Sequence, residues 1–163
     1  MTVCQTVYDD LNASRGVGAD AIALRDSLGN VLRDLCRSES LGSARWQTLA
    51  AIDEVGRECG IENWDGYGAQ PVKADVLREA RRFARALPPD FPLPNVGADP
   101  DGEISFDWDF APRRAFSVSI SGAGRLSYAG LFDQDRIHGT ESFRTAAPPF
   151  IIMSVRRLLF TLH

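Results

Sequence analysis

The spacing of apolar residues changes at the proline pair Pro88 and Pro89. Before the prolines, apolar side chains recur every three or four residues, which is the period of an amphipathic helix. After them, apolar and polar residues alternate, which is the period of a strand with one buried face. Because the strands are grouped together and do not alternate with helices, the sequence predicts an α+β fold with an antiparallel sheet.

Three N-terminal helices are predicted before the prolines. The first runs from an N-cap at Asp20 to about Cys36, and the second runs from Ser43 to a terminating glycine, Gly60. The third begins near Pro71, a residue suited to a first helical turn. The residues of the second helix that are predicted to face inward are Trp46, Leu49, Ile52, Val55 and Cys59.

An antiparallel meander of four to five strands is predicted after the prolines. The turn at 99–102 has hairpin composition, and it is expected to join a strand near 93–97 to a strand over 103–110. The residues of this second strand that are predicted to share the buried face are Ile104, Phe106, Trp108 and Phe110.

A clearer hairpin and a closing helix complete the predicted fold. The hairpin joins 115–121 to 125–132 through a Ser-Gly-Ala-Gly turn, and a short fifth strand is expected near 142–144. The helix opens at Pro148 and carries an apolar stripe as far as Leu162. We expect the third helix and this C-terminal helix to pack on the apolar face of the sheet.

The size and composition of the chain are those of one globular domain, with 163 residues, 44% of them hydrophobic and 25% charged. We expect a single domain over 1–163, with a loosely ordered start over 1–16 and the motif-bearing core over 62–163. No segment approaches the roughly 20 apolar residues of a membrane span, and the first residues lack the features of a signal peptide. The expectation is a cytoplasmic protein without a membrane partner.

The three cysteines, Cys4, Cys36 and Cys59, form an odd set without CxxC spacing. We interpret them as small hydrophobic residues that stay reduced, and not as a metal site. No complete phosphate-binding or dinucleotide-binding loop is present, so no cofactor is expected.

Several segments resemble those of a widespread set of small, uncharacterised bacterial proteins. They are NWDGYGAQP, LPPDFPLP, DGEISFDW, FSVSISGAGRLSYAGLF and HGTESF, in this order, and together they cover roughly Glu62 to the C-terminus. The resemblance implies a partner-binding role, of the kind found among small variable proteins of mobile or accessory gene clusters. It transfers no catalytic residue to this chain.

Two groups of residues are candidates for binding a protein partner. Trp64 and Tyr67 would form an aromatic lip beside Asp65, although the same residues are also typical of a packed turn. The third helix carries an excess of positive charge, which favours an acidic protein partner or, alternatively, a solvated face with ion pairs along the helix. Its candidate residues are Arg78, Arg81, Arg82 and Arg85. The net charge of −4 and the absence of a reader motif argue against nucleic acid.

A set of carboxylates and one histidine provides a candidate catalytic site. Asp107 and Asp109 share one strand face and are candidate metal ligands, while the more common interpretation is a solvated face of the sheet. The candidate catalytic residues, which follow later in the chain, are Asp133, Asp135, His138 and Glu141.

The favoured interpretation is a non-catalytic protein-interaction module. It would be one component of a bacterial two-gene accessory system, toxin–antitoxin-like or defensive, whose partner is a genomic neighbour. Binding would use the edge or face of the sheet or the basic side of the third helix, and a homodimer remains open. The first alternative is a small metal-dependent hydrolase or nuclease that uses the carboxylates and His138. The second alternative is a DNA-binding regulator.

Overall fold

The computed structural model describes residues 44–159. The predicted helix over 20–36, Cys4, Cys36 and the last residues of the closing helix lie outside these described residues. The described part begins with a helix over 44–58 and continues with α3 (Ala74–Ala86), five strands and α4 (Pro149–Leu159). The strands are β1 (Asn95–Ala98), β2 (Ile104–Ala111), β3 (Arg114–Ile120), β4 (Arg125–Phe132) and β5 (Asp135–Ser142).

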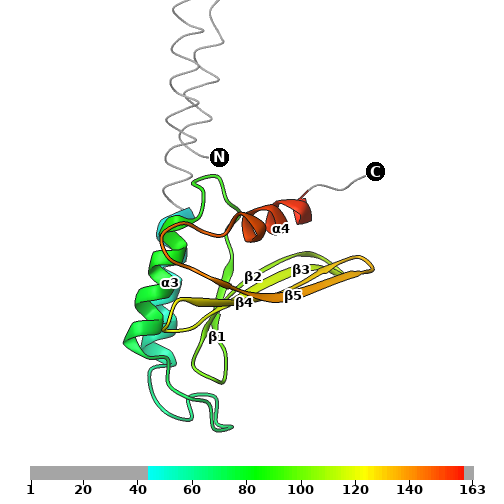
Figure 1. Cartoon of the computed structure of the whole chain (residues 1–163). Helices are drawn as coiled ribbons and strands as arrows, with labels where there is room; N and C mark the ends of the chain where they lie inside the picture. Colours follow the sequence, from blue (N-terminus) through cyan, green and yellow to red (C-terminus); the bar gives the residue numbers. More distant parts are fainter. Residues whose placement is uncertain (1–43, 160–163) are drawn as a thin grey trace, which may run out of the picture. The chain divides into compact units, whose positions relative to one another are not determined.

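The five strands form one antiparallel meander in the order β1-β2-β3-β4-β5 (Figure 1). Two predicted helices precede the sheet and one follows it, so the predicted α+β class and the antiparallel sheet are confirmed. Both predicted hairpins form, and each turn contains a glycine with positive φ, Gly102 at 83° and Gly124 at 71°. These turns fix the register of the strands that they join.

The core lies between one face of the sheet and the helices. The sheet contributes the alternating residues of its three inner strands, and α3 and α4 both pack against β2 and β3, as predicted. The Phe83 ring of α3 meets the Phe106 ring edge-on, with 5.2 Å between centroids. The fully buried side chains of the three strands include Ile104, Phe106, Trp108, Phe116, Val118, Ile120 and Leu126.

Two aromatic residues lie outside the core, contrary to the sequence prediction. Phe110 is 44% exposed, because the pairing of β2 with β3 shifts between Asp109 and Ala111 and leaves Phe110 in a bulge. Trp46 is 73% exposed. The buried side of its helix follows a stripe that is rotated away from Trp46, namely Thr48, Ile52 and Val55, and continues into Cys59 just after the helix.

The fifth strand also differs from the prediction. It runs over Asp135–Ser142 and not over 142–144. Ile137 is the only large apolar residue in this stretch, so no apolar alternation marks it in the sequence. An edge strand can form without such a pattern, because its backbone bonds to one neighbour and its side chains need no core on either face.

Candidate protein-interaction surface

The loop over 63–71 is held together by its own polar groups. The indole nitrogen of Trp64 donates to the carbonyl oxygen of Gln70 at 3.0 Å, and the Trp64 side chain packs against the core. The Asp65 carboxylate accepts backbone hydrogen bonds from Tyr67 at 2.8 Å and Ala69 at 3.1 Å, which lower its pKa. Trp64 therefore anchors the loop, while Tyr67, which is 94% exposed, is the member of the predicted lip that a partner can reach.

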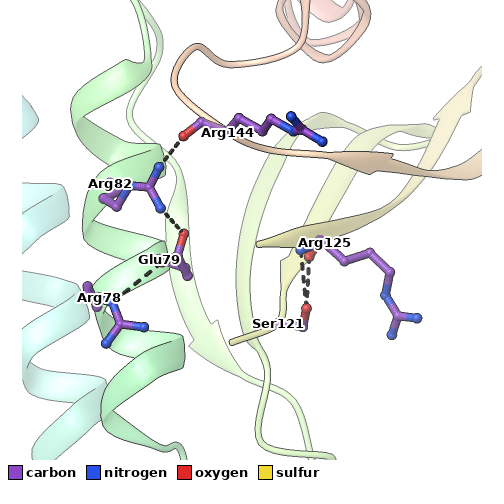
Figure 2. Close-up of polar contacts among 6 residues, drawn as sticks. All are labelled: Arg78, Glu79, Arg82, Ser121, Arg125 and Arg144. Atoms are coloured by element: carbon purple, nitrogen blue, oxygen red, sulfur yellow. Dashed lines mark hydrogen bonds and ion pairs between the residues drawn. The ribbon is translucent and has the colours of Figure 1, made fainter. Parts of the chain in front are cut away.

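The basic side of α3 is organised around a buried carboxylate, that of Glu79 (Figure 2). Arg82 pairs with Glu79 at 2.6 Å, and the Arg78 guanidinium lies 3.5 Å from the same carboxylate. Arg82 also donates to the backbone carbonyl of Arg144 and lies 5.4 Å from the Phe143 ring centre. Arg82 thus ties α3 to the segment that follows β5.

The remaining two arginines of α3 differ in their surroundings. Arg81 donates to Asp53 at 2.6 and 2.9 Å and so connects α3 to the helix over 44–58. Arg85 is exposed and makes no ion pair within residues 44–159. Three of the four candidate arginines therefore contact carboxylates of this chain, which reduces the positive charge that α3 offers to a partner.

The candidate catalytic and metal-ligating residues are spread over the sheet. Asp107 and His138 share one face and lie in the same cross-strand row, on β2 and β5. Three strand spacings of roughly 4.8 Å separate their backbones by about 14 Å. Asp135 and Glu141 lie an odd number of residues from His138, so their side chains point to the opposite face of β5.

Two further candidates are also apart from His138. Asp109 lies on β2, two cross-strand rows beyond Asp107, and Asp133 lies in the turn between β4 and β5. Asp135 forms an ion pair with Arg157 at 2.8 Å. In the part of the chain that the structure describes, no three His, Cys, Asp or Glu residues form a group able to hold a metal ion.

The sheet face opposite α3 and α4 carries small polar, apolar and charged side chains, and α3 and α4 both pack on the other face. Its side chains include Ser117, Ser119, Ser127, Ala129 and Thr140. We call this surface the open face. A shallow hollow of about 440 Å³ lies on it over β3, β4 and β5, lined in part by Leu131, Arg136 and His138.

Charge is divided across the open face. The acidic residues lie on the β1 and β2 side and surround a second hollow of about 450 Å³, which contains Asp99, Asp101 and Glu103. Partial burial, together with the nearby Asp101 and Asp99 carboxylates, raises the pKa of Glu103, against the opposing effect of Arg125 at 3.7 Å. The basic side chains of the open face lie on β4 and β5, at Arg125 and Arg136.

The two edges of the sheet are unequal. The β1 edge is four residues long and follows Pro92 and Pro94, and short strands and prolines both prevent further pairing. The β5 edge is eight residues long, contains no proline and is largely exposed. A regular, exposed edge of this length is a template for an additional strand.

The pairing pattern shows which backbone groups of β5 are free. Phe143 N–H donates to the carbonyl oxygen of Gly124 at 2.8 Å, so the odd-numbered residues of β5 bond to β4. The even-numbered residues direct their N–H and C=O groups away from the sheet, and no strand within residues 44–159 pairs with them. These outward residues are Arg136, His138, Thr140 and Ser142.

Sequence reasoning identified His138 but did not identify this edge. The available signal was the two-residue gap Asp133-Gln134 after β4, since a two-residue loop joins hairpin strands and predicts a partner strand starting at Asp135.

Within the described residues, no helix is both long and apolar enough to cross a bilayer. Comparison of the chain with models of protein families, with curated proteins and with solved structures found no match. The geometry of the open face and of the β5 edge is therefore the basis for assigning a function.

Proposed function

We propose that this protein is a non-catalytic protein-interaction module that binds an extended segment of another protein as an additional strand beside β5. The observation that supports this proposal is the row of outward backbone groups on β5, which is unpaired within residues 44–159. Addition of a strand supplies affinity through backbone hydrogen bonds and specificity through alternate side chains. A component of a two-gene accessory system, with a genomic neighbour as its partner, needs a surface of this kind.

The β5 edge is preferred over α3 because three of the four α3 arginines already contact carboxylates of this chain. Arg81 and Arg82 each hold α3 to another part of the fold, through Asp53 and through Glu79 and Arg144. A protein partner that recruited them would have to break these contacts. The backbone groups of β5 require no such rearrangement.

Proline substitution at an outward position of β5 tests the proposal. His138→Pro and Thr140→Pro each remove one outward N–H group and leave the hydrogen bonds to β4 in place, because proline is tolerated where the N–H of an edge strand faces solvent. His138→Ala and Thr140→Ala are the matched controls, since they change the same side chains and keep the N–H groups. Arg85→Glu tests whether the partner binds instead to the basic side of α3.

The full chain, tagged and isolated from its native host, is expected to carry one stoichiometric protein partner. We expect the alanine variants and Arg85→Glu to retain this partner and both proline variants to lose it, while circular dichroism shows that all are folded. Retention of the partner by the proline variants, or its loss in Arg85→Glu alone, would contradict binding at the edge.

A further inference from the structure

The two sides of β5 differ in chemistry, and this difference defines the segment that fits beside it. On the open face, the exposed side chains of β5 are Arg136, His138, Thr140 and Ser142, and none of them is acidic. In the cross-strand row of Arg136, the acidic residue of this face is Asp109 on β2, about 14 Å away by strand spacing. That distance exceeds the Debye length of roughly 8 Å at physiological salt, so Asp109 hardly offsets the charge of Arg136, and the neighbouring Asp135 is paired with Arg157.

On the opposite side, which faces α4, the β5 edge continues into an apolar surface. The Phe150 ring of α4 lies 5.1 Å from the Tyr128 ring of β4, and Tyr128 extends over Gly139 of β5. A Cβ atom built on Gly139 would lie 2.5 Å from the Tyr128 hydroxyl oxygen. The aromatic contacts therefore reach from α4 across β4 to the edge strand.

Met153 adds to this apolar surface. Arg157 of α4 contacts the Phe132 ring at 4.6 Å and pairs with Asp135 at 2.8 Å, so the flank of α4 that bears Phe150 and Arg157 faces β4 and β5. Met153 lies three residues after Phe150 and four before Arg157, which places it on the same flank. Met153 is 70% exposed and Phe150 is 41% exposed. We call Tyr128, Ile137, Phe150 and Met153 the edge apolar patch.

We infer that the segment bound at β5 alternates acidic and apolar residues. This inference rests on the proposed strand addition, because side chains of an added strand alternate between the open face and the side of α4. Residues on the open face lie next to Arg136 and are complementary when acidic. On the other side, where Asp135 is paired with Arg157 and Glu141 lies towards the far end of the strand, residues next to Ile137 and the α4 flank are complementary when apolar.

A second copy of the chain does not meet this requirement. Its β5 would present Arg136 and His138 on the open face again, together with Thr140 and Ser142, and no acidic residue. On the other side, Asp135 and Glu141 would contribute like charges of their own. Charge complementarity therefore favours a different chain as the occupant.

Four fluorescent nine-residue peptides, titrated with the full chain and followed by anisotropy at nanomolar peptide concentration, test the inference. Their alternating patterns are Glu/Val, Lys/Val, Glu/Thr and Lys/Thr. We expect the dissociation constant of Glu/Val to be at least about tenfold lower than those of Lys/Val and Glu/Thr, since one modest favourable contact changes affinity about tenfold. Arg136→Glu is expected to reverse the preference between Glu/Val and Lys/Val, and Met153→Ser to weaken Glu/Val while leaving Glu/Thr unchanged.

The outcomes separate this inference from the proposed function. Equal binding of the four peptides, lost in Thr140→Pro, would overturn the acidic–apolar inference and leave strand addition intact. Discrimination among peptides that persists in Thr140→Pro would overturn strand addition. If none of the four peptides binds, the inference is overturned. It is also overturned if sedimentation velocity shows a homodimer that His138→Pro and Thr140→Pro convert to a monomer.

Discussion

At the scale of single residues, two of the charged side chains singled out in the sequence hold the backbone of this protein in place. Asp65 closes the loop over 63–71 by accepting two backbone hydrogen bonds, and Glu79 anchors Arg82, which in turn reaches the Arg144 carbonyl. These roles account for side chains that look like site residues in the sequence. Spacing along the chain indicated that Trp64 and Asp65 lie in a turn. The N–H groups that reach the carboxylate, those of Tyr67 and Ala69, each follow a glycine with positive φ, Gly66 and Gly68.

The Asp65 contacts predict a pH-dependent contribution to stability. Backbone N–H donors lower the pKa of Asp65 in the folded state below its ordinary value of 3.8. The stabilisation is therefore complete above pH 3.8 and is lost as the pH falls through the lower, folded-state pKa. We expect Asp65→Asn to lower the unfolding temperature at neutral pH and to differ progressively less from the unsubstituted protein in acid below 3.8.

Thermal unfolding followed by circular dichroism, in pH steps, measures this effect. Glu62→Gln is the matched control, because Glu62 is an exposed neighbouring acid. If the difference in unfolding temperature between Asp65→Asn and the unsubstituted protein stays constant through the acid range, the charge of the carboxylate is not the cause of that difference.

At the scale of elements, the hairpin turns were predictable and the edge strand was not. Turn chemistry is local, so Asp99 to Gly102 and Ser121 to Gly124 can be read directly from the sequence. The β5 strand has one large apolar residue, Ile137, and its place is set by pairing with β4 and not by burial. The exposure of Phe110 was also missed because it depends on strand pairing. A one-residue bulge shifts the alternation of buried and exposed side chains that the sequence pattern predicts.

The Ser121–Gly124 turn predicts a measurable requirement for glycine. Gly124 has φ 71°, and a Cβ atom there would lie 3.0 Å from the carbonyl oxygen of Phe143. Gly66 has nearly the same φ, 76°, and no atom within 4 Å of such a Cβ. Both alanine substitutions therefore incur the left-handed backbone cost of about 1–2 kcal/mol. We expect Gly124→Ala to cost roughly 1 kcal/mol more than Gly66→Ala, because the adjacent backbone must also move.

Urea unfolding of the two variants compares the costs directly. Equal losses in the free energy of unfolding would show that the turn has room for a methyl group and that the contact with Phe143 adds nothing.

At the scale of the whole molecule, the candidate site depended on the position of the last strand in the predicted meander, which the sequence placed wrongly. Asp107 was predicted on a strand, but His138 was predicted to precede the short strand expected near 142–144, and only the observed order β2-β3-β4-β5 shows that two strands lie between them. The helices and the buried faces were predictable because apolar periodicity reports burial. Long-range pairing leaves no comparable signature in one sequence, so residues such as Arg136 and Met153 were not identified.

Hydrogen exchange of the full chain reports on the free edge without any partner. We expect the slowest amides in the buried central strands β2 and β3. In β5, the N–H groups of Ile137, Gly139 and Glu141 bond to β4 and are expected to exchange slowly, while those of His138 and Thr140 are expected to exchange at nearly unprotected rates. Slow exchange at His138 and Thr140 would show that the outer side of β5 is already covered in the isolated protein.

The inequality between the β1 and β5 edges also limits stoichiometry. Growth of a sheet into a fibre requires two receptive edges on every subunit, so that each one accepts a neighbour and offers itself to the next. In the described part of this chain, Pro92, Pro94 and the shortness of β1 close one edge and leave β5 as the only receptive one. The proposed strand addition at β5 would therefore end with a single guest segment per chain and give complexes of one host and one guest.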